Sequence, residues 1–281
     1  MGNISLTRLS NTLSDLGVSF LDLCFPRCCA GCGKTWLFAA EGAWCRACLE
    51  ELPWIRPPIC TVCGCPFPDS APTAGHLCGD CILSAFSFDS ARSATNHSGV
   101  VRDRIHQLKF GGQLCFGPPL AELLAKVLRE DGFASDSVDL LVPVPLHVRR
   151  LGRRGFNQAG ILARMLGEKL GMTVRFDALV RKQWTDPQTR LSRMERLENV
   201  KGAFAVRNEA EVEGKRIILV DDVFTTGTTL SECAKTLKAS GAVAVHAVTV
   251  TRALPERKAA QDSQSEPWRE GWEHAERSRF A

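Results

Sequence analysis

A hydrophobic run at positions 217–220 is followed directly by two acids, Asp221 and Asp222. Such a run predicts a buried parallel strand, and ligands of open α/β sheets bind at the carboxyl ends of the strands. Carboxylates at that edge can accept hydrogen bonds from the vicinal hydroxyl groups of a sugar. The pair therefore predicts a sugar-binding site, with Asp221 and Asp222 as its chemical centre.

A turn rich in threonine follows the acids. Gly227 permits close approach of the backbone to a ligand, and the helix expected from about residue 230 to 240 directs its positive end toward the same place. Threonine hydroxyl and backbone N–H groups can donate to phosphate oxygens, so the whole run predicts a sugar-phosphate site rather than a plain helix cap. The residues expected to hold the phosphate are Val223, Thr225, Thr226, Gly227, Thr228 and Thr229.

Eight of the 13 cysteines form four Cys-x-x-Cys pairs in the first third of the chain. This spacing lets both thiolates bind one tetrahedral metal ion, so four pairs suffice for two zinc ions. Sequential pairing is the simplest assignment, although interleaved pairing also satisfies the sequence. The expected ligands are Cys29, Cys32, Cys45 and Cys48 at one site and Cys60, Cys63, Cys78 and Cys81 at the other.

Both zinc sites are predicted to be structural. Four thiolates leave no coordination position open to water, and this part of the chain has few long apolar runs with which to fold without metal. A redox-active cysteine pair is the alternative. Cys28 could replace Cys29, and His76 is a further candidate ligand, but the Cys29–Cys32 spacing favours Cys29.

A basic run at positions 149–158 contains four arginines and two glycines between a predicted strand and a predicted helix. That placement indicates a second anion site, with Arg150 and Arg154 as candidate contacts. A solvated basic loop is the alternative. The basic run lies in a wider region, 141–216, that has 16 Lys and Arg against 8 Asp and Glu, so this part of the chain is suited to phosphates or a nucleic-acid backbone.

Alternating strands and helices after the cysteine pairs predict an α/β domain. A basic segment at 185–199 is long enough for a mobile loop over the site, and leucines at helical spacing near the start predict an amphipathic helix. The predicted strands are 86–97, 139–145, 201–206, 217–220 and 243–251, and the predicted helices are 5–24, 99–108, 120–129, 158–170 and 230–240.

Composition and termini favour a cytoplasmic protein. The 44% hydrophobic and 23% charged content is ordinary for a globular chain. No apolar run reaches the length of a membrane span, and the first residues lack a clear signal-peptide pattern. In a reducing compartment, clustered cysteine pairs indicate metal more often than disulfides.

Three separated features together resemble the ComF family: the paired cysteine ribbons, Arg150 with the run 154–158, and the acid-threonine run 220–229. The resemblance implies a type I phosphoribosyltransferase-like parallel sheet flanked by helices, preceded by a small double zinc-ribbon module. The expected divisions are an N-terminal amphipathic helix at 1–24, the double zinc ribbon at 25–84, the phosphoribosyltransferase-like domain at 85–252, and a tail at 253–281 that we expect to be disordered.

The resemblance also assigns roles to the candidate residues. The ligand it implies is 5-phosphoribosyl 1-pyrophosphate (PRPP) or a related nucleotide, bound with Mg²⁺. Asp221 and Asp222 would hold the ribose hydroxyls, while Arg150, Arg154 and Lys109 would neutralise the pyrophosphate. Position 97 departs from the family pattern, because His97 stands where a tyrosine is expected.

Three functions follow as hypotheses. The first is a PRPP-binding protein, and a possible phosphoribosyltransferase, that acts in DNA uptake and natural transformation. The second is a non-catalytic accessory protein that binds single-stranded DNA and works with a competence helicase. The third is a scaffold whose catalysis has lapsed. Turnover stays open, since no residue stands out in the sequence as a general base or a reader of the acceptor base.

Overall fold

The fold is described from a computed structural model of the 281-residue chain. The described residues are 27–36, 42–68, 75–83, 85–131, 138–183 and 200–254. The predicted helix at 1–24, the basic segment at 185–199 and all but the first two residues of the predicted tail lie outside these ranges. Within them, no helix is long and apolar enough to cross a membrane.

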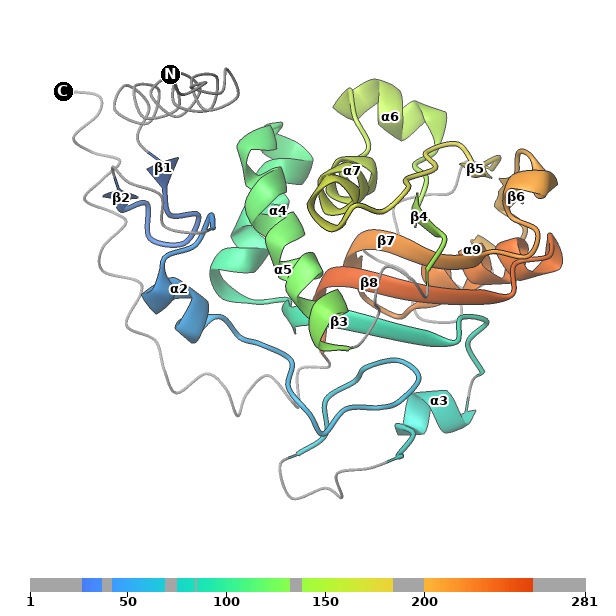
Figure 1. Ribbon diagram of the computed structural model, residues 1–281, viewed down its shortest axis with the longest axis horizontal. Coiled ribbons are helices and arrows are strands. Elements are labelled where there is room, and N and C mark those ends of the chain that lie inside the picture. Colours follow the sequence, from blue (N-terminus) through green and yellow to red (C-terminus); the bar gives the residue numbers. More distant parts are fainter. Residues whose placement is uncertain are drawn as a thin grey trace, which may run out of the picture.

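A four-stranded parallel sheet forms the centre of the molecule (Figure 1). Its order is β3 (Ser90–Asn96), β8 (Ala244–Arg252), β7 (Arg216–Phe224) and β4 (Leu140–Pro143). The apolar run of β7 is fully buried, as expected for a strand covered on both faces. The predicted parallel sheet with flanking helices is confirmed.

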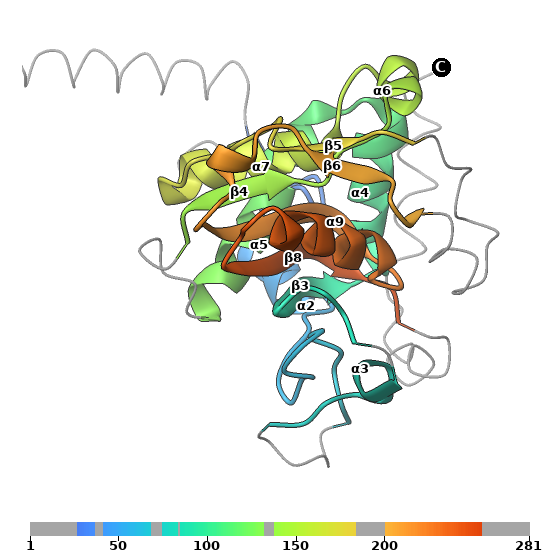
Figure 2. The ribbon, with the colours of Figure 1, turned by 90° about the vertical axis from the view of Figure 1, so that its right-hand side faces the viewer.

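Helices cover both faces of the sheet (Figures 1 and 2). Alternate residues of β7 enter opposite cores: Ile218 and Val220 pack on one side, and Ile217 and Leu219 on the other. The first core is shared with α4 (Gly99–Gly111), α5 (Gly117–Glu130) and α7 (Gln158–Leu170), and the second with α9 (Thr228–Ala239). The period of two along a strand explains this division.

The basic run that follows β4 contains a helix, α6 (Val148–Arg154), where the sequence predicted only a strand-to-helix connection. His147 caps it, because its Nδ1 accepts a hydrogen bond from the N–H of Arg149 at 3.2 Å. Gly155 ends it in the left-handed conformation, with φ of 78°, as is common at helix ends. The arginines of this run therefore project from a helix whose two ends are defined.

The remaining elements are short. An antiparallel pair joins β5 (Leu179–Arg181) to β6 (Phe204–Val206). The described residues also contain the 3₁₀ turns η1 (Leu114–Phe116) and η4 (Glu209–Glu211). The cysteine-rich region contributes β1 (Arg27–Cys28), β2 (Thr35–Trp36), α2 (Arg46–Glu51) and α3 (Gly79–Leu83).

Each half of the cysteine-rich region packs on a different part of the α/β domain. In the first half, the indole of Trp44 donates to the carbonyl of Pro119 on α5 at 2.9 Å. In the second half, the carbonyl of Val62 accepts from the N–H of Ala91 on β3 at 2.6 Å. The second half therefore extends the hydrogen bonding of the sheet beyond its edge strand.

Candidate functional site

The predicted strand, turn and helix around the acid pair are confirmed. β7 runs through Asp221 and Asp222, and α9 begins at Thr228 after a turn capped by Gly227. Gly227 has φ of 75°, and a Cβ at this position would lie 2.6 Å from the ring of Phe224. Only glycine satisfies both the backbone conformation and this contact without strain.

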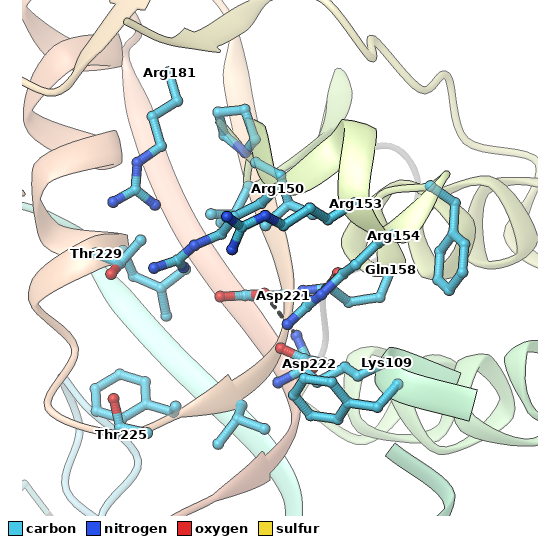
Figure 3. Close-up of a pocket in the computed structure, with 18 of the residues that line it drawn as sticks. Lys109, Arg150, Arg153, Arg154, Gln158, Arg181, Asp221, Asp222, Thr225 and Thr229 are labelled. Atoms are coloured by element: carbon cyan, nitrogen blue, oxygen red, sulfur yellow. Dashed lines mark hydrogen bonds and ion pairs between the residues drawn. The ribbon is translucent and has the colours of Figure 1, made fainter. Parts of the chain in front are cut away.

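A pocket of about 1080 Å³ opens at the carboxyl end of β7 (Figure 3). In the close-up, Arg150, Arg153 and Arg154 of α6 extend into the pocket that holds the two aspartates, and Arg181 of β5 reaches in from the side of Thr229. The charged residues that line the pocket are Lys109, Arg150, Arg153, Arg154, Arg181, Asp221 and Asp222. Five cationic side chains against two carboxylates favour a polyanionic ligand.

The two acids have different surroundings. Asp222 is 3% exposed, forms an ion pair with the ammonium of Lys109, and donates its backbone N–H to Asp221 Oδ1 at 2.9 Å. Burial and the adjacent Asp222 raise the pKa of Asp221 well above its usual range, although Lys109 opposes the shift. Bringing a cation or sugar hydroxyls to this pair would relieve the repulsion between the carboxylates.

Arg154 is held in place by two contacts at the pocket wall. Its Nη1 donates to Gln158 Oε1 at 3.1 Å, and its guanidinium lies 4.8 Å from the ring centroid of Phe110. Asn157 fixes the start of α7, because its Oδ1 accepts from the N–H of Ala159 at 3.1 Å while its Nδ2 donates to the carbonyl of Val144 at 3.0 Å. This basic wall is therefore preorganised for anions.

The eight cysteines of the Cys-x-x-Cys pairs form two groups of four, as sequential pairing predicts. Within each group the sulfur atoms lie within 4.8 Å of one another: Cys29, Cys32, Cys45 and Cys48 in one, and Cys60, Cys63, Cys78 and Cys81 in the other. Four sulfurs bound to one zinc ion at about 2.3 Å lie about 3.8 Å apart. Several closer pairs match this spacing, including Cys32 and Cys45 at 3.9 Å and Cys60 and Cys81 at 3.6 Å.

Backbone donors to sulfur also fit metal-bound thiolates. The Cys29 sulfur accepts from the N–H groups of Gly31 at 3.3 Å and Cys45 at 3.2 Å. Burial raises the pKa of Cys29, but these backbone donors outweigh it and lower the pKa to about 7. Cys28 and His76 are exposed and lie outside both groups. The donor set therefore supports two structural zinc sites.

Comparison with known proteins supports this architecture. The phosphoribosyl transferase domain family matches residues 120–274, and the double zinc ribbon domain family matches residues 20–82. The chain is 35% identical over 207 residues to the DNA utilization protein YhgH of Salmonella typhi, which covers 71% of this chain and 86% of that protein. The chain belongs to the ComF family.

Two further relatives extend the ComF family match. Competence protein F of Haemophilus influenzae is 30% identical over 221 residues, covering 77% of this chain and 93% of that protein. Competence protein ComFC of Bacillus subtilis is 30% identical over 220 residues, covering 74% of this chain and 83% of that protein. Both the zinc ribbons and the phosphoribosyltransferase domain are thus parts of a recognised ComF-family chain.

In the structure, the residues of this ComF-family protein that were predicted to bind phosphate fall into two sets. Val223, Thr225, Gly227 and Thr229 line the pocket. The hydroxyls of Thr226 and Thr228 lie 3.0 Å from each other, and neither residue is among those that line the pocket. The side chains of these two threonines therefore stabilise the turn, and any contact they make to a ligand would come from their backbone N–H groups.

Several residues that line the pocket were not among the predicted ligands, and Arg181 and His97 are two of them. Arg181 comes from the short strand β5, and no local motif marks it in the sequence. His97, noted only as a departure from the family pattern, also lines the pocket, and its Nδ1 lies 2.8 Å from Thr251 Oγ1. Burial and then Lys109 lower the pKa of His97, which favours a neutral ring near pH 7.

Proposed function

We propose that this ComF-family protein binds PRPP, or a closely related ribose phosphate, and acts in DNA utilisation and uptake. One observation carries the proposal: the acid pair at the end of β7 faces the arginines of α6 across one pocket, with a glycine-capped turn beside them. PRPP has a diol, a monophosphate and a diphosphate. These three groups match the acids, the turn and the basic wall.

The ribose would lie over Asp221 and Asp222, whose oxygens accept hydrogen bonds from its hydroxyls. The 5-phosphate would lie at the turn, where the first N–H groups of α9 have no partner within the helix. The pyrophosphate would lie against Arg150 and Arg154, which neutralise its charge. Arg181 would add a further cation from β5.

Magnesium ion fits the same pocket as a companion of PRPP. It prefers oxygen ligands and is commonly held by one or two carboxylates together with substrate phosphates. Oδ2 of Asp222 is buried and already contacts a cation, the ammonium of Lys109. Asp221 and Asp222 would hold the ion, which would supply positive charge to offset the acid pair and the phosphates of the ligand.

Transfer of the phosphoribosyl group is an extension of this proposal. The bond between C1 of the ribose and the pyrophosphate oxygen would break as a bond from C1 to the acceptor forms, and the electron pair would leave with pyrophosphate. Arg150 and Arg154 would stabilise the charge that develops on that leaving group. Release of pyrophosphate from PRPP in the presence of candidate acceptors measures this step.

The relatives' names support the DNA-related part of the proposal, since they refer to DNA utilization and competence. A second candidate function is direct binding of single-stranded DNA beside a helicase partner. It is favoured by the exposed side chains of Arg149 and Arg153 on α6, because exposed arginines can track a phosphate backbone. Salt-dependent oligonucleotide binding that is lost in the variant Arg149→Glu/Arg153→Glu would support it.

Calorimetric titration of the zinc-loaded protein with PRPP and Mg²⁺ tests the main proposal. Wild type should bind, and Asp222→Asn should weaken binding about tenfold or more because a charged acceptor is lost. Asp103→Asn is the matched control, since Asp103 is an exposed acid that does not line the pocket. Absence of binding by wild type, or equal binding by Asp222→Asn, would contradict the proposal.

A further inference from the structure

A buried arginine at the end of β8 joins the second zinc site to the sheet. That site is the group formed by Cys60, Cys63, Cys78 and Cys81. Arg252 is only 5% exposed. Its Nη1 donates to the carbonyl of Cys63 at 2.7 Å, and its Nη2 donates to the Cys63 sulfur at 3.4 Å. A zinc ion with four thiolates carries net negative charge, so the guanidinium is an outer partner suited to that centre.

The same guanidinium lies on the ring of Phe224. The distance from Arg252 Cζ to the ring centroid is 4.1 Å, within the range of a cation–π contact. Phe224 is 1% exposed and is paired with Arg252 in the register of β7 and β8. Its position is therefore determined from one side by the residue that also contacts a zinc ligand.

Phe224 in turn supports the turn proposed to hold the phosphate. Gly227 packs so closely that an added Cβ would lie 2.6 Å from Phe224 Cζ and 2.9 Å from Phe86 Cε1. The rings of Phe86 and Phe224 meet edge to face, with centroids 6.2 Å apart. A shift of the Phe224 ring would therefore move Gly227 and with it the start of α9.

Other arginines contact the ribbons without this connection. Arg92 donates to the carbonyl of Thr61 in the second ribbon at 3.1 Å and pairs with Asp131, but the structure gives it no contact with Phe224. Arg104 donates to the carbonyls of Ala30 and Gly31 in the first ribbon. Of the described arginines that contact the ribbons, Arg252 is the one that also contacts Phe224, so a path from a cysteine ligand to the turn runs through it.

We propose that Arg252 is a positioning residue through which the metal-loaded second zinc site holds the phosphate-binding turn in its binding geometry. The inference rests on the proposed function of that turn. With zinc bound, Cys63 is immobilised, Arg252 keeps both donors on it, and the Phe224 ring stays under Gly227. Without zinc, Arg252 loses a fixed partner, and the turn loses its support although no cysteine lines the pocket.

Thermodynamic linkage gives this proposal a reciprocal consequence. If zinc at the second site favours ligand binding at the turn, ligand at the turn must favour retention of that zinc by the same factor. A zinc ribbon that merely stabilises the fold at a distance predicts no such effect on a folded, fully loaded protein. Zinc retention is therefore a readout that does not depend on turnover.

The experiment follows zinc release from the full-length protein to a coloured chelator, with and without saturating PRPP and Mg²⁺. In wild type, PRPP should raise the affinity for one of the two zinc ions about fivefold, as measured by the amount of zinc that the chelator has removed at equilibrium. Arg252→Lys keeps the charge but cannot contact the carbonyl, the sulfur and the ring together. It should bind PRPP about tenfold more weakly and lose the protection of zinc.

Two further variants make the result specific. Arg92→Lys alters an arginine of β3 that contacts the same ribbon but not Phe224, and should keep the wild-type protection. Phe224→Leu leaves the Arg252 donors on Cys63 but removes the ring, and should lose the protection while retaining two zinc ions per chain. If Arg252→Lys does not retain both zinc ions, Phe224→Leu alone tests the proposal.

The outcomes separate this inference from the proposed function. PRPP binding by wild type with no change in zinc release, or wild-type protection in Phe224→Leu, would overturn the role of Arg252 alone. Failure of zinc-loaded wild type to bind PRPP would overturn the proposed function, and the inference with it.

Discussion

Lys109 at the end of α4 and Asp222 near the end of β7 form an ion pair at the base of the pocket. The Asp222 side chain is 4% exposed and that of Lys109 is 20% exposed, so both charges are largely removed from water. In the proposed complex, a bound pyrophosphate and magnesium ion would compete for the two partners. The pair is thus both a structural contact and a part of the proposed ligand site.

Replacing Lys109 should therefore affect both stability and binding. Lys109→Met leaves a buried carboxylate without its cation, and should lower the free energy of unfolding by about 3 kcal/mol in urea titrations. Lys109→Met/Asp222→Leu should recover most of this stability but not PRPP binding. Lys126→Met, which breaks an exposed pair with Glu130, should change stability little. Equal losses from Lys109→Met and Lys126→Met would contradict the expectation.

The raised pKa of Asp221 predicts a pH dependence with a definite sign. The folded protein keeps this proton at pH values where the unfolded chain, with a pKa of about 3.9, has lost it. This group's contribution to stability is therefore complete below the unfolded pKa and is lost as pH rises through the folded pKa. Asp221→Asn should gain stability relative to wild type between pH 4 and pH 8. Urea midpoints measured across that range would show no trend in the difference if the pKa were ordinary.

Gly227→Ala should disturb the turn through both backbone strain and contact with Phe224. Gly214→Ala is the control, because Gly214 has a similar φ of 70° but no atom within 4 Å of an added Cβ. Strain alone costs about 1–2 kcal/mol in either variant. We expect the Gly227 variant to lose more stability and also PRPP affinity, whereas the Gly214 variant should bind as wild type does. Denaturation and calorimetry measure the two effects separately.

Arg181→Met should weaken PRPP binding about tenfold, because it removes a cation that lines the pocket and that also contacts the ring of Phe204. Arg207→Met is its control, since Arg207 is exposed and pairs only loosely with Asp177 at 3.6 Å. Unchanged affinity in the Arg181 variant would remove β5 from the proposed site. The comparison is made by calorimetry at constant ionic strength.

Metal analysis should find two zinc ions per chain in wild type and in Cys28→Ser, because Cys28 lies outside both four-cysteine groups. Replacing all four cysteines of the first group by serine should leave one zinc ion bound. Interleaved ligation would leave none in that variant, since each site would then lose two thiolates. The measurement is elemental analysis after gel filtration.

Several features of this protein follow from the sequence alone because they depend on neighbours along the chain. The buried run before Asp221 predicts its strand, and the threonine-glycine turn predicts the start of α9. Each Cys-x-x-Cys pair predicts a shared metal, since two-residue spacing places both sulfurs on one side of a tight turn. The alternation of strands and helices predicts the layered α/β fold.

Tertiary packing decided those contacts that the spacing of residues along the chain does not specify. It selected sequential grouping of the cysteines over interleaved grouping, and it turned the hydroxyls of Thr226 and Thr228 toward each other. It also brought Arg181 to the pocket and Arg252 to Cys63. These contacts join residues far apart in the chain, so their geometry depends on how whole elements bury their apolar faces. The sequence identifies the chemical groups, and the packing of helices on the sheet determines which of these groups come into contact.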